Sequence, residues 1–162
     1  MGLLTQPINA LSSLAFIPAG MLAIVAAMRA TGRLRLYLAV YAGTLIAVGL
    51  GSFAYHGPQP AWAGQAHDGS IIVALVCAIL LAATAGGRRT RVWHTGPGRL
   101  SAALVAAALA AYAAGRTGSP LCDPDSWIQL HAVWHVLAAG SALALAWAAA
   151  AAPADRSSGP SG

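Results

Sequence analysis

Long apolar segments dominate this chain and exclude an ordinary water-soluble fold. Hydrophobic residues make up 58% of the 162 residues and charged residues only 8%, whereas about a quarter of the residues of a soluble domain are charged. A helix needs about 17–25 mostly apolar residues to cross a bilayer. The sequence therefore predicts an all-α, polytopic transmembrane bundle of about five helices. The apolar segments lie at residues 10–29, 35–55, 69–86, 100–115 and 129–152.

The connections between these segments are too short to hold a second folded domain. We expect residues 1–152 to form a single transmembrane domain and the tail at 153–162 to be disordered in the cytoplasm. The first apolar segment follows no basic residue and is long, which predicts a retained helix rather than a cleaved signal peptide. Segment 100–115 is mostly Ala, Leu and Val, so it depends most on packing against its neighbours.

The basic residues indicate how the chain lies in the membrane. The net charge is +5 and every basic residue is an arginine. In a five-helix topology only Arg116 lies on one side, and all the other arginines lie on the opposite side. The positive-inside rule then predicts an N-terminus outside the cytoplasm and a cytoplasmic C-terminus. Nucleic acid is not an expected partner, because no solvated basic face is present to bind it.

Two histidines at the start of the last apolar segment predict a metal site. His131 and His135 are four residues apart, so their rings lie on one face of a helix and can reach one ion. His56 ends the second apolar segment and follows Ser52 by one helical turn. The topology brings these residues and Asp68, which precedes the third segment, to the outer side. Three histidines leave one position open for water, as in catalytic zinc sites.

Each of these residues also has a structural interpretation. A serine in a membrane helix commonly bonds to the carbonyl four residues earlier, which would explain Ser52. A lone histidine at the interface, such as His56, is more often solvated than bound to a metal. Ionisable residues in membrane helices are costly and tend to be functional, and this favours the metal site. His67, beside Asp68, could replace Asp68 or could orient a metal-bound ring, and it is the reserve ligand.

These separated motifs resemble the alkaline ceramidases and their bacterial relatives, within a superfamily that includes the progestin and adipoQ receptors. Ser52 and His56 are similar to the family's Ser-x-x-x-His, and His131 and His135 to its His-x-x-x-His. Asp68 is similar to its intervening aspartate. The opening Pro-Ile-Asn-Ala-Leu-Ser-Ser-Leu resembles its Pro-x-Asn-Thr-x-Ser-Asn-Leu segment. The motifs span about half of the chain.

The chain departs from the family in two respects. Family members usually have seven helices, and the two that are missing here would fall between Asp68 and His131, where they would form part of the lipid pocket. The animal enzymes carry an N-terminal calcium site built from acidic residues. This chain has no acidic residue before Asp68, and Gln6 stands near the position of one of them. Calcium is therefore not expected.

The resemblance implies a zinc-dependent membrane hydrolase that cleaves the amide bond of a ceramide-like lipid. Zn2+ held by the three histidines would be the electrophile and would provide hydroxide at neutral pH. Asp68 would act as general base and then as general acid. Ser52 would donate a hydrogen bond to the developing oxyanion.

Other functions stay open at this point. A metal-containing sensor or receptor without turnover is one alternative, and a b-type haem protein is another, although the close pair of His131 and His135 counts against haem. The pocket could also need a second copy of the chain, as in a homodimer. The use of arginine without lysine and the high alanine content are typical of a GC-rich bacterial genome. They predict a bacterial plasma membrane, with the metal site facing outward.

Overall fold

The described part of the protein is mostly helical. The computed structural model describes residues 4–84, 89–116, 118–119, 121–122 and 126–151, and these residues form no strand. The predicted all-α class is confirmed. The helices are α1 (Pro7–Ser13), α2 (Phe16–Arg29), α3 (Gly32–His56), α4 (Ala63–Thr84), α5 (Arg89–His94), α6 (Gly96–Gly115) and α7 (Leu130–Ala151).

Five helical stretches are long and apolar enough to cross a membrane. Helices α1 and α2 together form the first, and α3, α4, α6 and α7 form the others, with lengths between 20 and 25 residues. The architecture is thus the predicted five-helix transmembrane bundle. Helix α5 is a short additional helix before α6 that the apolar pattern did not indicate.

Several helices begin earlier than their apolar segments. Helix α3 begins at Gly32 rather than residue 35, and α4 begins at Ala63 rather than residue 69. Polar residues are common in the first turns of a helix, where they can reach water or cap the backbone. The first apolar residue of a segment therefore does not mark the first residue of the helix. Asp68 consequently lies in the second turn of α4. Residue 152 and the tail at 153–162 lie outside the described residues.

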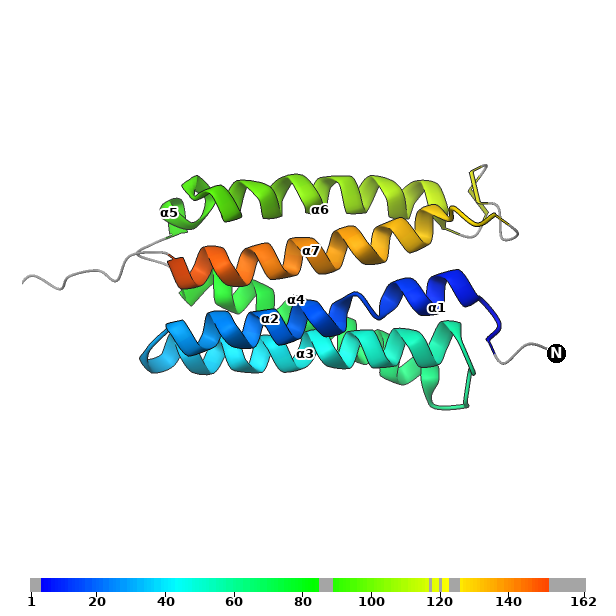
Figure 1. Cartoon of the computed structure of the whole chain (residues 1–162), viewed down its shortest axis with the longest axis horizontal. Coiled ribbons are helices and arrows are strands. Elements are labelled where there is room, and N and C mark those ends of the chain that lie inside the picture. Colours follow the sequence, from blue (N-terminus) through cyan, green and yellow to red (C-terminus); the bar gives the residue numbers. More distant parts are fainter. Residues whose placement is uncertain (1–3, 85–88, 117, 120, 123–125, 152–162) are drawn as a thin grey trace, which may run out of the picture.

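The first membrane-crossing stretch is broken between α1 and α2. The amide nitrogens of Leu14 and Ala15 donate to carbonyls three residues earlier, and Ile17 N donates to Leu14 O at 3.0 Å. Pro18 has no N–H to bond the Leu14 carbonyl, so the regular ladder cannot continue through this point. Figure 1 shows the resulting break, which gives α1 a direction of its own.

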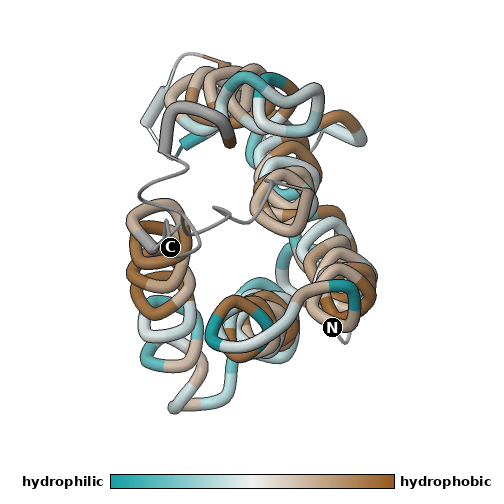
Figure 2. Tube along the Cα trace, turned by 90° about the vertical axis from the view of Figure 1, so that its left-hand side faces the viewer, coloured by the Kyte–Doolittle hydropathy of each residue, from teal (hydrophilic) through white to brown (hydrophobic). Residues whose placement is uncertain are grey.

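The helices follow one another around an arc rather than in chain order. Helix α6 packs along α7, α7 packs against α1 and α2, these pack against α3, and α3 packs against α4. Viewed along their axes, the helices surround the middle of the molecule in this order (Figure 2). Helix α4 packs chiefly on α3 and leaves apolar side chains such as Ile72 and Ile79 exposed.

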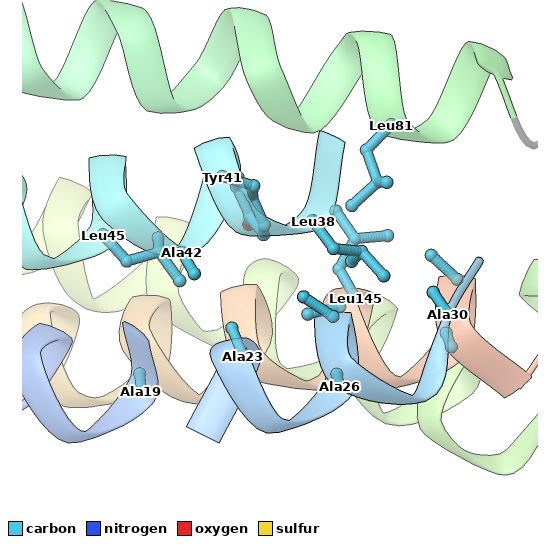
Figure 3. Packing of buried hydrophobic residues seen from close by; sticks show 14 of the residues in the cluster. Ala19, Ala23, Ala26, Ala30, Leu38, Tyr41, Ala42, Leu45, Leu81 and Leu145 are labelled. Atoms are coloured by element: carbon cyan, nitrogen blue, oxygen red, sulfur yellow. The ribbon is translucent and has the colours of Figure 1, made fainter. Parts of the chain in front are cut away.

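Small residues allow the central helices to approach closely. Ala19, Ala23 and Ala26 of α2 face the larger side chains of α3, including Leu38 and Leu45 (Figure 3). Packing of small against large side chains is the usual basis of helix association in a bilayer, where the hydrophobic effect gives little driving force.

Hydroxyl groups join the last two helices. Ser101 of α6 donates to the backbone carbonyl of Ser141 in α7, and Ser141 donates to that of Ser101, each at 3.0 Å. Such bonds between helices contribute about 0.6 kcal/mol on average in a membrane. They hold α6 in register with α7.

Two glycines bring backbones together at one end of the bundle. A Cβ on Gly51 of α3 would lie 2.8 Å from the carbonyl oxygen of Ala66 in α4, and a Cβ on Gly115 would overlap the backbone of His131. The end of α3 therefore meets the start of α4, and the end of α6 meets the start of α7. Helix α1 lies at the same end (Figure 1).

Candidate metal centre

Three histidines meet at this end of the bundle. His56 is the last residue of α3, and His131 and His135 lie in the first two turns of α7. One ring nitrogen from each lies within 4.8 Å of the others. The ring centroids are 5.1 Å apart for His56 and His131, 5.2 Å for His56 and His135, and 4.7 Å for the α7 pair. The fold thus brings together the three residues that the sequence predicts as metal ligands.

The unsatisfied atoms of this cluster fit a bound metal ion. The Nε2 atoms of His56 and His131 are buried and have no hydrogen-bond partner in the described part of the chain. A buried polar atom without a partner is costly, and an ion at this point would remove the cost. A tetrahedral zinc ion would set the ligand nitrogens ~3.4 Å apart.

Helix α1 and its N-cap residue Gln6 contact two of the three rings. Gln6 Oε1 lies 2.8 Å from His56 Nδ1, and Ser12 Oγ lies 2.9 Å from His135 Nδ1. Asn9 Nδ2 donates to Gln6 Oε1 at 3.1 Å. None of these three side chains was predicted to have a role in the site. Their spacing of three residues, at the start of an otherwise apolar segment, is the signal that could have found them.

Ser52 and Asp68 have different positions relative to the cluster. Ser52 is buried in α3, one turn before His56. The Asp68 side chain is 76% exposed, and its Oδ1 lies 2.7 Å from Nδ1 of His67. Ser52 is thus close to His56 along the helix, whereas the Asp68 carboxylate is not part of the histidine cluster among the described residues.

His67 lies between Asp68 and the cluster. Its side chain is only 17% exposed. Its ring stacks on Tyr55 with centroids 4.6 Å apart and lies edge-on to the ring of His56 at 5.7 Å. A carboxylate bonded to one nitrogen of an imidazole orients the ring. Asp68 is thus linked to the cluster through His67.

One hollow adjoins the histidines, and a second hollow of different character lies beside it. A cavity of about 600 Å³ has both polar and apolar lining residues, among them Gln6, His56, Arg116 and His131. An apolar groove of about 320 Å³ runs along the first turns of α7, beside Ser12. Its apolar lining residues are Trp127, Ile128, Ala132, Val133, Val136 and Leu137. Gln129 lines both hollows, so the two lie side by side.

Comparisons with protein-family models, with curated proteins and with solved structures find no match to this chain. Its function is therefore inferred from the residues and their geometry.

The donor set itself limits what the site could bind. Imidazole nitrogens suit zinc and other first-row transition metals, whereas calcium and magnesium prefer oxygen ligands. Three histidines without a carboxylate among the described residues of the cluster match one ligand set of catalytic zinc sites, which keep a position open for water. The arrangement is suited to activating water beside a polar cavity and an apolar groove.

Proposed function

We propose that this protein is a membrane hydrolase that uses Zn2+ to cleave the amide bond of a ceramide-like lipid. His56, His131 and His135 would hold the ion. The observation that carries the proposal is the convergence of these three rings from two helices, with two buried Nε2 atoms unpartnered among the described residues. The similarity of the motifs to those of the alkaline ceramidases supports the reaction class.

The side chains around the cluster would have different roles in the reaction. When bound, zinc supplies an electrophile and makes water acidic enough to react at neutral pH. The Ser52 hydroxyl would donate to the substrate carbonyl oxygen as that oxygen gains negative charge. The His67 ring would take a proton from the attacking water and return it to the leaving amine, with Asp68 holding the ring in place. Asp68 would then act through His67 rather than on the water itself.

The two hollows support an amphiphilic substrate. The apolar groove along α7 would take an acyl chain, and the polar cavity beside His56 and His131 would take the head group. The amide bond would then lie between them, next to the histidines. Arg116, at the cavity wall, would stay in contact with water and with the head group.

The charge distribution supports an orientation in the membrane. Arg29, Arg33 and Arg35 lie around the turn between α2 and α3, at the end of the bundle opposite the histidines. Under the positive-inside rule that end faces the cytoplasm. The metal site would then face the periplasm or the exterior of a bacterial cell.

The metal content of purified protein tests the proposal first. Protein purified in detergent without chelator should contain about one zinc per chain, and the variant with His56, His131 and His135 all changed to alanine should contain none. His94→Ala is the matched control, because His94 ends α5 at the other end of the bundle. Folded parent protein without zinc would contradict the proposal.

Turnover separates the hydrolase from the second candidate, a metal-containing sensor of the same superfamily. The exposed Asp68 carboxylate lies outside the histidine cluster, so turnover would depend on His67 as the base, whereas a sensor needs no base. Zinc-loaded protein should release fatty acid from ceramides or other lipid amides. Zinc binding without such release across a panel of lipid amides would favour the sensor.

The ring geometry counts against a haem protein. Bis-histidine haem needs two rings on opposite faces of a macrocycle, whereas these three rings lie with centroids no more than 5.2 Å apart. The purified protein should show no Soret absorbance.

A further inference from the structure

We infer that α1 is a clamp that sets the tautomers of two metal-binding histidines. Gln6 would hold His56, and Ser12 would hold His135, each as the tautomer with a proton on Nδ1 and a bare Nε2. Asn9 would hold Gln6 in place. All three are positioning residues. The inference rests on the proposed metal site, because a ring can bind a metal only through a nitrogen that carries no proton.

The bond to Gln6 determines the tautomer of His56. An amide oxygen can only accept hydrogen bonds, so His56 Nδ1 must be the donor in its 2.8 Å contact with Gln6 Oε1. A neutral imidazole carries one N–H, and its Nε2 is therefore bare. Nε2 is in fact the buried atom of this ring that lacks a partner in the described part of the chain.

The contact with Asn9 fits a Gln6 amide whose oxygen faces the ring. Asn9 Nδ2 can only donate, and it lies 3.1 Å from Gln6 Oε1. If the Gln6 amide were turned around, its NH2 group would face the NH2 group of Asn9. The oxygen of Gln6 therefore accepts from Asn9 and His56 together.

The direction of the Ser12 hydroxyl indicates the tautomer of His135. The Ser12 hydroxyl has one hydrogen, and it donates that hydrogen to the backbone carbonyl of Asn9 at 3.0 Å, since a carbonyl cannot donate. With its hydrogen directed at that carbonyl, Ser12 Oγ accepts in its 2.9 Å contact with His135 Nδ1. The proton of His135 lies on Nδ1, and its Nε2 is free to bind a metal.

The backbone holds α1 over the cluster. Gln6 N donates to the carbonyl of His56 at 2.8 Å, and Thr5 N donates to that of Gly57 at 3.1 Å. The break after α1 lets this helix pack against both α3 and α7. Residues 6, 9 and 12 follow at intervals of three, so their side chains project along one side of the helix.

The tautomers can be read directly in metal-free protein. Two-bond proton–nitrogen couplings in 15N-histidine-labelled protein, at a pH where the rings are neutral, should show Nδ1–H for His56 and His135. Gln6→Ala should release His56 alone into a tautomer mixture, and Ser12→Ala should release His135 alone. Nε2–H in both rings of the parent protein would overturn the inference, whether or not the protein binds zinc.

Zinc affinity gives a second readout. Loss of an outer partner of a metal-binding histidine typically weakens metal binding by roughly 10–100-fold, and we expect this from Gln6→Ala and from Ser12→Ala in competition with a chelator. Gln6→Glu keeps an oxygen acceptor and should restore the affinity lost in Gln6→Ala.

Ser13→Ala is the matched control for this experiment. Ser13 is buried in the same helix, and its hydroxyl donates to the carbonyl of Ala10 at 2.7 Å. This change should leave zinc affinity near the parent value. Parent-like affinity in both Gln6→Ala and Ser12→Ala, or an equal loss in Ser13→Ala, would contradict the clamp. Absence of zinc from the parent would instead contradict the proposed function, and the tautomer measurement would still decide on α1.

Discussion

Ser12 and His135 are 123 positions apart in the chain, and their side chains meet with 2.9 Å between Oγ and Nδ1. This contact joins the first helix of the protein to the last. Together with the bond between Gln6 and His56, it makes α1 part of the wall around the histidine cluster. A helix of seven residues thus links α3 and α7 at the point where the proposed metal would bind.

Metal removal should destabilise the protein. A ligand that binds only the folded state stabilises it by about 2.7 kcal/mol at a concentration 100 times its dissociation constant. We expect a strong chelator to lower the melting temperature of the parent in detergent. The variant lacking His56, His131 and His135 should not respond to the chelator. An equal shift in both proteins would show that the chelator acts elsewhere.

Changes at Asp68 and His67 should have the same effect on turnover. If the carboxylate acts through the ring, Asp68→Asn and His67→Ala should each lower fatty acid release by roughly 10²–10⁴-fold, the usual contribution of a general base. The double variant should be no worse than the more severe single variant, because the two residues would act as a unit. Zinc content should stay unchanged in all three.

A loss of turnover in the Asp68 variant alone would identify Asp68 as the direct base. In that case Asp68→Asn would abolish turnover, and His67→Ala would have little effect.

Gly51→Ala should separate α3 from α4. The new Cβ would lie 2.8 Å from the carbonyl oxygen of Ala66, so backbone has to move. Overpacking of this kind costs about 1–3 kcal/mol, which thermal unfolding in detergent would measure. Gly43→Ala in the same helix is the control, because a Cβ added there would meet no neighbouring element within 4 Å. It should be neutral or slightly stabilising, since alanine favours helix more than glycine does.

A bulky side chain in the apolar groove should impair long-chain substrates selectively. Val136 lines the groove and is partly exposed, so Val136→Trp would fill the groove without disturbing the core. We expect a higher KM for long-chain lipid amides, little change for short-chain ones, and normal zinc content. Val40→Trp on α3, outside the groove, is the control. Equal losses for both chain lengths would contradict a role of the groove in acyl binding.

Much of the helix framework could be predicted from local sequence. Hydropathy sums over a segment, so the number of membrane-crossing helices follows from the sequence without knowledge of their neighbours. The number of crossings also determines the end of the bundle at which His56, His131 and His135 lie. The break between α1 and α2 was not predicted, because Leu14 and Ala15 are apolar and only Pro18 marks the interruption.

The parts of the site that depend on helix rotation could not be predicted. His67 and Asp68 are neighbours in the chain, and successive residues of a helix point about 100° apart, so only one of them can face α3. Packing of Gly51 against Ala66 selects His67 for that direction and leaves Asp68 exposed. From the sequence, Asp68 was expected to transfer the proton, and His67 was its possible replacement.

The sequence alone predicts the class of the protein, its five apolar helices and the end of the bundle at which the histidines lie. These features depend on hydropathy, helical spacing and the number of crossings, which are local or additive properties. Other relationships arise only in the folded molecule: the three rings converge, Gln6 and Ser12 bond two of them, and His67 lies between Asp68 and the cluster. They depend on how each helix is rotated and how closely it packs, and the backbone contacts at residues such as Gly51 and Gly115 set both.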